Sequence, residues 1–247
     1  MIESGILPLF TPAAEKHAYW WNVAGEWVEA PNVRRHGWSG VLRVRHDVGI
    51  VYVKRQYNHL CRTLAHPFGW PTASREHLHL HVLRQLELNV PVPLFHAVMR
   101  RAGAVEAVLV TAALEGFAPL NALPRLDHIE RTAVAREVGH VVGRMHRARI
   151  QHSCLYDKHV MVRWHGAAPE VALLDLEKAR ARLTPGAAAR HDLDQLRRHQ
   201  DLWSAPEWEL LLASHARAMA GAGAARGDAQ REAGRPRSFE VRPQAGV

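Results

Sequence analysis

Residues 150–162 read Ile-Gln-His-Ser-Cys-Leu-Tyr-Asp-Lys-His-Val-Met-Val, and residues 171–177 read Val-Ala-Leu-Leu-Asp-Leu-Glu. The first stretch is a polar loop that passes into a short apolar strand, and the second is an apolar strand that ends at Asp175. An Asp at the end of a buried strand loses its solvation unless it binds a metal or is fully hydrogen-bonded. Asp175 is therefore a candidate metal ligand, with structural capping as the alternative.

The loop and the second strand follow each other as in the catalytic region of protein kinases. Kinases carry H-R-D-L-x-x-x-N in the loop and D-F-G after the second strand. On this layout His152 falls at the kinase His, Cys154 at the catalytic Asp, His159 at the metal-binding Asn and Asp175 at the Asp of D-F-G. The order predicts a phosphotransfer site, and Cys154 and His159 depart from the kinase pattern.

Each polar residue of the loop has a functional and a structural interpretation. His152 is expected to support the loop backbone or to be a satisfied core histidine. Cys154 acts as a catalytic base only if its pKa is depressed, so Asp157 is a candidate substitute, or a turn residue. Lys158 is a candidate for the γ-phosphate, or a solvated lysine. His159 is a second-rate direct ligand because Mg²⁺ prefers oxygen, so a contact through water or a phosphate is expected.

The N-terminal half offers the residues that would bind phosphates. The segment Ile50-Val-Tyr-Val-Lys54 resembles the V-A-I-K strand of kinases, and alternation puts Tyr52 and Lys54 on one face. Lys54 is a candidate for the α- and β-phosphates, or an ordinary strand-end lysine. Glu76, in the first turn of the next helix, is its natural ion-pair partner, although Glu also suits the helix dipole there. Residues 34–40 are a candidate phosphate-covering loop, or a plain β-turn.

Composition favours anionic partners and a reducing compartment. The 247 residues carry a net charge of +8, although an Arg-rich proteome gives basic proteins without a charged ligand. Two cysteines, Cys61 and Cys154, imply no disulfide framework. No apolar run approaches the roughly 20 residues that cross a bilayer, and the first residues lack a signal-peptide pattern. We therefore expect a cytoplasmic protein whose membrane contact, if any, is peripheral.

Strand patterns come first along the chain and helical patterns second, which indicates an α+β protein with a sheet-rich N-lobe and a helical C-lobe. The predicted strands are 41–45 and 49–54, which form a hairpin, then 104–111, 160–162 and 171–174. The predicted helices are 71–89 with Leu78, Val82 and Leu86 on its apolar face, then 128–148, 192–203, and 204–219 opened by a capping box at Ser204. Residues 220–247 have little to bury and are expected to be disordered.

The loop Gln151-His-Ser-Cys-Leu-Tyr-Asp-Lys-His159, together with Asp175-Leu-Glu-Lys178, resembles the lipopolysaccharide kinase family, in particular its InaA-like branch. The resemblance covers about residues 20–215. It implies a protein-kinase-like two-lobe domain over residues 1–219, with an N-lobe over about 20–111 and a C-lobe over about 112–219. It also implies ATP and Mg²⁺ as cofactors and a heptose or Kdo sugar of the lipopolysaccharide core as acceptor.

Carried over by residue, the resemblance makes Lys54 the phosphate-binding lysine, Glu76 its partner, Asp175 the main Mg²⁺ ligand and His159 a second metal- or phosphate-side residue. Core-sugar kinases have Asp where this chain has Cys154, so the chain departs from the family at the base. Losing a base typically costs about 10²–10⁴-fold, which leaves a slow kinase in reach.

Two hypotheses follow from this resemblance. The first is an ATP-dependent phosphotransferase that acts on an anionic glycolipid at the inner face of the inner membrane. The second is a pseudokinase, a nucleotide-binding regulatory or stress-response protein without transfer, which Cys154 favours. A metal-binding protein is a weaker reading, based on mixed His and Cys ligands and on His77 and His81 one helical turn apart. Nucleic acid is not expected as a partner, because most tryptophans read as core.

Overall fold

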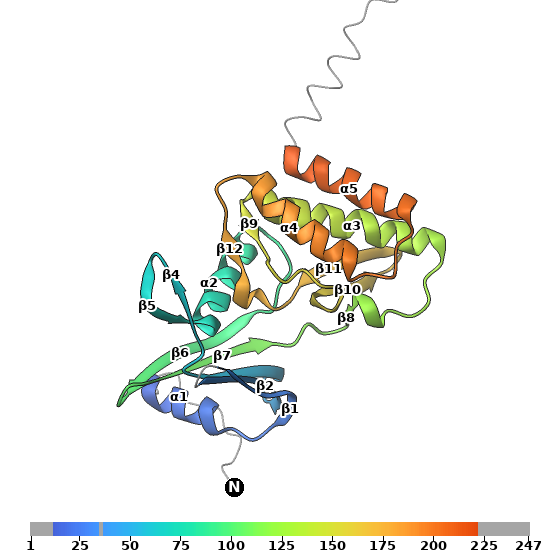
Figure 1. The fold of residues 1–247 in the computed structure, drawn as a ribbon. Helices are drawn as coiled ribbons and strands as arrows, with labels where there is room; N and C mark the ends of the chain where they lie inside the picture. Colours follow the sequence, from blue (N-terminus) through green and yellow to red (C-terminus); the bar gives the residue numbers. More distant parts are fainter. Residues whose placement is uncertain (1–11, 35–36, 222–247) are drawn as a thin grey trace, which may run out of the picture.

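The computed structural model of the chain describes residues 12–34 and 37–221. Its N-terminal part is built on a five-stranded antiparallel sheet with strand order β1-β2-β3-β7-β6 (Figure 1). The strand bounds are β1 Glu26–Arg34, β2 Gly37–His46, β3 Gly49–Tyr57, β6 Pro93–Arg101 and β7 Ala104–Ala112. The predicted hairpin and the predicted strand 104–111 are confirmed, whereas β1 and β6 lie outside the predicted set.

The two faces of β3 differ, as strand alternation predicts. Val51 and Val53 are fully buried in a small core that includes Trp20 of helix α1 (Ala13–Asn22). Tyr52 and Lys54 alternate with them and line a cavity on the other side of the strand. A single strand therefore supplies both a core face and a face for the candidate site.

Helix α2 (Thr72–Gln85) lies between the sheet and the C-terminal part (Figure 1). The predicted apolar face is right in part: Val82 and Leu86 pack against the core beside the buried Leu80 and Leu83. Leu78 is the exception, because it is 49% exposed. The helix also ends before the predicted residue 89: Glu87 adopts a positive φ of 54°, and the Leu88 N–H donates to the Leu83 carbonyl. These bonds satisfy carbonyls that end the helix, as left-handed caps commonly do.

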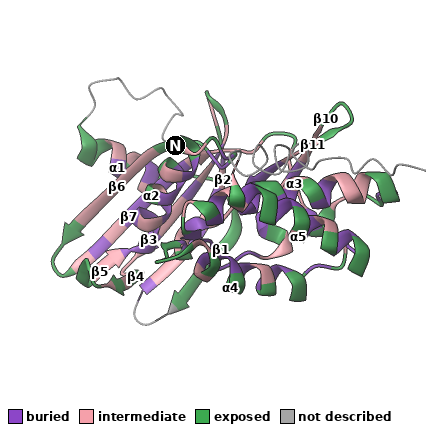
Figure 2. Ribbon diagram, turned by 90° about the horizontal axis from the view of Figure 1, so that it is seen from above, coloured by how far each residue is buried: buried purple, intermediate pink, exposed green. Residues whose placement is uncertain are grey.

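The C-terminal part is centred on α3 (His128–Arg147), which packs along α5 (Ala205–Ala220) (Figure 1). Two glycines allow the close approach. A Cβ at Gly139 would overlap the Leu211 carbonyl, and one at Gly143 would lie 2.6 Å from the His215 carbonyl oxygen. Buried residues gather along α3 and the central strands (Figure 2). The predicted helix 128–148 is thus confirmed, and it forms the main core of this part.

The polar loop of residues 151–159 lies between α3 and the later helices, in a region of short strands and 3₁₀ turns. The predicted strands of the loop region are present as β10 (Val160–His165) and β11 (Ala168–Leu173), which form a sheet with β8. The other short elements are β4 Leu60–Thr63, β5 His66–Pro71, β8 Ala118–Pro119, β9 Ile150–Gln151, β12 Arg180–Ala181, and the 3₁₀ turns η1 Leu120–Ala122, η2 Asp157–His159 and η3 Leu176–Lys178.

The last helices differ from the prediction at one boundary. Helix α4 (Pro185–Arg198) does not continue to Trp203 as predicted, because the chain leaves the helix at His199. The predicted capping box is confirmed, since the Ser204 N–H donates to Glu207 Oε2 at 2.9 Å. Disorder was predicted over residues 220–247, but Ala220 is the last residue of α5. Residues 222–247 lie outside the described residues. Within the described ranges, no helix is both long and apolar enough to cross a bilayer.

Candidate active site

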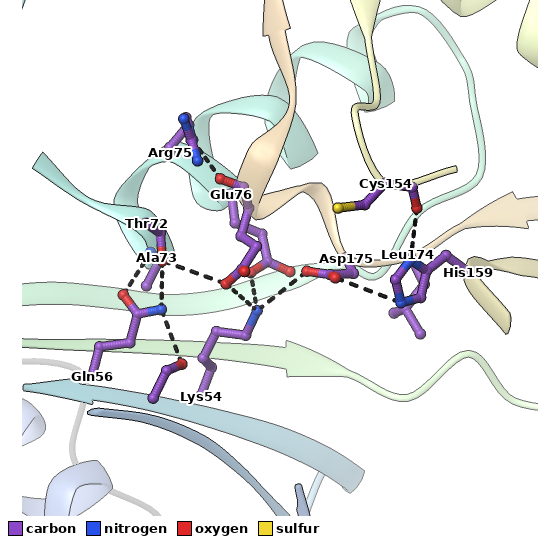
Figure 3. A network of polar contacts seen from close by, with 12 residues as sticks. Lys54, Gln56, Thr72, Ala73, Arg75, Glu76, Cys154, His159, Leu174 and Asp175 are labelled. Atoms are coloured by element: carbon purple, nitrogen blue, oxygen red, sulfur yellow. Dashed lines mark hydrogen bonds and ion pairs between the residues drawn. The ribbon is translucent and has the colours of Figure 1, made fainter. Parts of the chain in front are cut away.

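Lys54 meets three carboxylates where the sheet adjoins the C-terminal part (Figure 3). Its Nζ lies 2.5 Å from Glu76 Oε2, 3.5 Å from Glu177 Oε2 and 3.7 Å from Asp175 Oδ1. The partners come from α2, from η3 and from the residues after β11, which are distant in sequence. The structure therefore brings together Lys54, Glu76 and Asp175, which the sequence pattern singles out separately.

Glu76 is held by the way α2 is attached to the sheet. It lies in the second turn of α2, not the first as predicted, so the helix dipole does not explain it. The Gln56 side chain fixes the start of the helix: its Oε1 accepts from the Ala73 N–H at 2.8 Å, and its Nε2 donates to Thr72 Oγ1 at 2.7 Å (Figure 3). Strand β3 thus positions both Lys54 and the helix that carries its partner.

Asp175 follows β11 in a left-handed backbone conformation, with φ 61° and ψ 67°. This conformation costs free energy for a non-glycine residue and is typical of functional sites. Asp175 Oδ1 is a buried atom with no hydrogen-bond partner in the described part of the chain, although Lys54 lies 3.7 Å away. An acceptor left in this state is suited to a cation.

Glu177 is a site residue that the sequence interpretation missed. Its carboxylate lies within reach of Lys54 and accepts from Thr72 Oγ1 at 3.4 Å, and its carbonyl accepts from Arg75 Nε. Oxygens of Glu76, Asp175 and Glu177 lie within 4.8 Å of one another. The signal was available, since Glu177 stands two residues after Asp175 in the stretch that decides the fold.

Burial and charge act in opposite directions on this cluster. Burial lowers the pKa of Lys54, but the carboxylates of Glu76, Asp175 and Glu177 outweigh it, so the pKa is raised. Burial raises the pKa of Asp175, but Lys54 and His159 outweigh it, so the pKa is lowered. Burial raises the pKa of Glu76, and Lys54 offsets only part of that effect. The cluster therefore holds a charged lysine beside an ionised Asp175.

His159 links the polar loop to Asp175. Its Nδ1 lies 2.8 Å from the Cys154 carbonyl oxygen, and its Nε2 lies 3.5 Å from Asp175 Oδ2 (Figure 3). A carbonyl only accepts, so Nδ1 carries the proton and Nε2 is the atom that faces the carboxylate. His159 thus lies beside Asp175, the candidate metal ligand.

His152 supports the loop backbone from inside, as one of its two interpretations expects. It is fully buried, its Nε2 donates to the Leu174 carbonyl at 3.0 Å, and its Nδ1 accepts from the Cys154 N–H at 3.3 Å. Burial lowers the pKa of His152 to about 4, so the ring is neutral at pH 7. His152 fixes the residue before Asp175 through its bond to the Leu174 carbonyl.

Asp192 of α4 anchors the same loop and was missed by the sequence interpretation. Its Oδ2 accepts from the His152 N–H at 2.6 Å and its Oδ1 from the Ser153 N–H at 2.8 Å, while His146 Nε2 donates to Oδ2 at 3.1 Å. Asp192 is fully buried. An Asp on the buried stripe of α4, where an apolar residue is expected, was the available signal.

Cys154 stands where the kinase pattern has its catalytic Asp, but its thiol is poorly suited to act as a base. Its side chain is buried, with 4% exposure. Burial raises the pKa of the thiol, and the Lys178 ammonium offsets only part of that effect. The thiol is therefore protonated at neutral pH and has no basic lone pair to activate an acceptor hydroxyl.

Asp157 and Lys158 lie apart from the Lys54 cluster. The Asp157 carboxylate accepts from the Lys158 N–H at 2.7 Å in the turn η2, and the Lys158 side chain is exposed. Neither side chain has a hydrogen bond or ion pair to Lys54, Glu76 or Asp175 within the described ranges. Asp157 therefore lies in a turn and Lys158 is an exposed lysine, as their structural interpretations expect. A catalytic role for either residue would require a bound substrate.

Two adjoining cavities meet at Lys54 and Asp175. One, of about 270 Å³, has mostly apolar walls. They include Val41, Tyr52, Leu109, Thr111, Met161 and Leu174. The other, of about 220 Å³, is polar and is lined in part by Asn32, Ser39, Glu177 and Lys178. Of the predicted phosphate-covering loop, residues 37–40 are part of β2, and residues 35–36 lie outside the described residues.

An apolar cavity beside a lysine–carboxylate cluster, between a sheet and a helical region, defines a protein-kinase-like protein. The chain belongs to the lipopolysaccharide kinase (Kdo/WaaP) family, whose profile matches residues 18–215. It is similar to Protein InaA of Escherichia coli (strain K12), with 35% identity over 197 residues, 77% of this chain and 91% of the relative. A solved structure of WaaP in complex with acyl carrier protein shares the fold with a TM-score of 0.63 at 19% identity, covering 88% of each chain.

Proposed function

We propose that the protein is an ATP- and Mg²⁺-dependent phosphotransferase that acts on a sugar hydroxyl. Membership of the lipopolysaccharide kinase family supports a kinase-like function. The observation that carries the proposal is the meeting of Lys54 with Asp175 and two further carboxylates at the junction of an apolar and a polar cavity. Phosphoryl transfer needs this combination of a cation for the phosphates and carboxylates for a metal.

The donor set fits Mg²⁺, which prefers carboxylate oxygens. Asp175 Oδ1 is buried without a hydrogen-bond partner in the described residues, and Glu177 adds a second carboxylate near it. Asp175 and Glu177 would hold the ion, and His159 would contact it through water or contact a phosphate. The ion would neutralise the charge that develops on the transferred phosphoryl group.

The nucleotide would lie across the two cavities. The apolar walls provided by Val41, Leu109 and Met161 suit a purine ring. Lys54, which lines both cavities, would bind the α- and β-phosphates while Glu76 fixes its ammonium. Lys158 would approach the γ-phosphate only once substrate is bound, because its side chain is exposed in this structure.

The acceptor would be a sugar hydroxyl of an anionic glycolipid such as the lipopolysaccharide core. The hydroxyl oxygen forms the new bond to phosphorus, the bond to the ADP oxygen breaks, and the hydroxyl proton passes to solvent with Asp157 as candidate relay. The net charge of +8 suits an anionic acceptor and a peripheral position on the inner face of the inner membrane. We further propose that residues 1–219 form the kinase-like domain, with lobes over about 20–111 and 112–219.

A transfer assay tests this proposal. The purified protein is incubated with Mg²⁺ and γ-labelled ATP, with and without extracted lipid A–core, and label in the glycolipid is measured. We expect transfer by the wild type and none by Asp175→Ala. The matched control is Asp194→Ala, which removes an exposed carboxylate that pairs with Arg198 on the surface of α4. Transfer that persists in Asp175→Ala would contradict the proposed metal ligand.

A second candidate function is a nucleotide-binding pseudokinase with a regulatory role. The observation that favours it is the buried, protonated thiol of Cys154 at the position of the catalytic base. In that case Mg-ATP would raise the melting temperature of the wild type but not of Asp175→Ala, and no label would reach any glycolipid. Absence of both transfer and stabilisation by ATP would overturn both functions.

A further inference from the structure

Helix α2 carries two accessible histidines one helical turn apart. The Nε2 atoms of His77 and His81 lie 3.1 Å apart, and their ring centroids lie 4.6 Å apart with the planes at 82°. His81 is exposed and His77 is half-buried, whereas Glu76 of the same helix is buried against Lys54. The pair is therefore open to solvent and separate from the lysine–carboxylate cluster.

The distance between the two Nε2 atoms matches the distance between two nitrogens that bind the same cation. Imidazole nitrogens bind Zn²⁺ at about 2.0–2.1 Å. Two nitrogens at that distance from one ion and 3.1 Å from each other subtend an angle of about 98° at the ion. This angle lies between the octahedral and tetrahedral values, so the two nitrogens already have a chelating separation.

The protonation state of the pair also suits a metal. Only one proton fits between two Nε2 atoms at this distance, so at least one of them presents a lone pair. Burial, and next the charge of His81, lower the pKa of His77, which keeps its ring in the neutral form that binds metals. A divalent ion in place of the shared proton would engage both nitrogens.

The ring of His77 is held in place by contacts with the sheet. It stacks on His96 of β6 with centroids 4.4 Å apart and planes at 14°. His96 Nε2 in turn lies 3.0 Å from Ser74 Oγ. Because one ligand is already oriented, binding has less conformational freedom to remove.

We propose that His77 and His81 form a binding site for a late first-row divalent cation, Ni²⁺, Cu²⁺ or Zn²⁺, with water completing the coordination. Imidazole ligands favour these ions, whereas Mg²⁺ takes oxygen ligands, so the site differs in chemistry from the one at Asp175. Chelation across one turn stabilises α2, the helix that positions Glu76. The site does not depend on the proposed function.

Titration of the untagged full chain with ZnCl₂, without nucleotide or Mg²⁺, tests the site by calorimetry. We expect one Zn²⁺ to bind the wild type at least about tenfold more tightly than it binds His77→Gln or His81→Gln. The same concentration of Zn²⁺ raises the melting temperature of the wild type but not of these variants. Circular dichroism of each metal-free variant verifies that α2 remains folded.

Two controls separate this pair from other donors. The double variant His81→Gln/Gln85→His keeps the composition of the chain but places the second imidazole eight residues from His77, about 12 Å along the helix, and we expect it to bind as weakly as His81→Gln. The variant Asp175→Ala keeps the tight site. Equal binding by wild type and the swapped variant, or loss of the tight site in Asp175→Ala, would overturn the proposal.

Discussion

The Nε2 atom of His159 lies 3.5 Å from Asp175 Oδ2, while Nδ1 of the same ring donates to the Cys154 carbonyl oxygen at 2.8 Å. The loop backbone thereby sets which ring nitrogen faces the carboxylate. His159 therefore faces the carboxylate that we propose as the metal ligand. Cys154 contributes to this arrangement through its backbone carbonyl.

Removing the imidazole should weaken the metal side of the site. We expect His159→Leu to raise the Mg²⁺ concentration needed for half-maximal stabilisation by ATP about 10- to 100-fold, because supporting groups near a metal contribute about this much. His159→Asn should lose less, since an amide oxygen is a good Mg²⁺ ligand. Thermal shift at increasing Mg²⁺ measures both. The exposed His165→Leu is the control, and an unchanged Mg²⁺ dependence in His159→Leu would refute the role.

The Lys54 ammonium compensates three carboxylates, so its loss should expose them to one another. We expect Lys54→Met to lose most stabilisation by ATP, by about 10- to 100-fold in affinity, because a charged hydrogen bond contributes about 1.5–3 kcal/mol. Mg²⁺ alone should stabilise Lys54→Met more than the wild type, since the ion replaces the missing charge near Glu76 and Asp175. Melting curves with and without Mg²⁺ verify this.

The control for that experiment is Arg45→Met, which removes one positive charge from an exposed position of the neighbouring strand. It should leave both responses unchanged. If Mg²⁺ stabilises Lys54→Met no more than it stabilises Arg45→Met, then the carboxylates do not share a cation and the proposed metal ligands are wrong.

Restoring a carboxylate at the base position should increase transfer. General-base help is typically worth about 10²–10⁴-fold, and Lys178 lies close enough to Cys154 to stabilise a new negative charge. We expect Cys154→Asp to raise the rate of label transfer at least about tenfold. Cys154→Ser, which keeps the size without adding a base, should leave the rate within a few-fold. A Cys154→Asp rate no higher than that of Cys154→Ser would argue against this position as the site of the base.

Acid should destabilise the fold because it protonates buried histidines that are neutral in the native state. Burial lowers the pKa of His152 and, separately, of His215 to about 4 each, from 6.5 in the unfolded chain. Between these values the unfolded chain binds protons that the native state does not, so stability is complete above pH 6.5 and falls as the pH decreases toward 4. A fully buried histidine such as His152 contributes roughly 3 kcal/mol to this loss.

Urea denaturation at several pH values between 7.5 and 4.5 measures that slope. His215→Gln removes one of the buried imidazoles and should flatten the dependence by up to one proton, whereas exposed His165→Gln should not change it. Stability that stays constant or increases as the pH falls through this range would show that these rings are accessible to protons in the folded state.

Much of the fold can be predicted from the sequence because the strongest hydrophobic patterns each lie within a single strand or helix. The alternation in residues 50–54 and the helical period in 128–148 each describe one element, and both elements are present. Strand β6 (Pro93–Arg101) is not predicted from the sequence. It is an edge strand with half-exposed residues on both faces, so its sequence shows little alternation. The buried side of α2 is predicted only in part: Val82 and Leu86 pack against the core, but this side also includes Glu76 and His79, which are polar.

Some residues of the candidate site can likewise be predicted from the sequence, and others cannot. Lys54, Glu76, His159 and Asp175 stand in positions that a kinase-like order of motifs marks, and the structure places them together. Asp192 could not be found by this route, because its partners are the backbone N–H groups of His152 and Ser153, which leave no side-chain pattern.

The position of Asp192 in the sequence also determines when the polar loop can be anchored during synthesis. It lies 40 positions after His152, the residue whose N–H it accepts. At roughly 5–20 residues per second, the ribosome makes the loop some 2–8 s before it makes this anchor. During that interval the Asp192 carboxylate is not available to the two N–H groups of the nascent loop. The site therefore cannot be complete until helix α4 has been synthesised, and a chain released before Asp192 would carry most of the site residues without the bond that holds their loop.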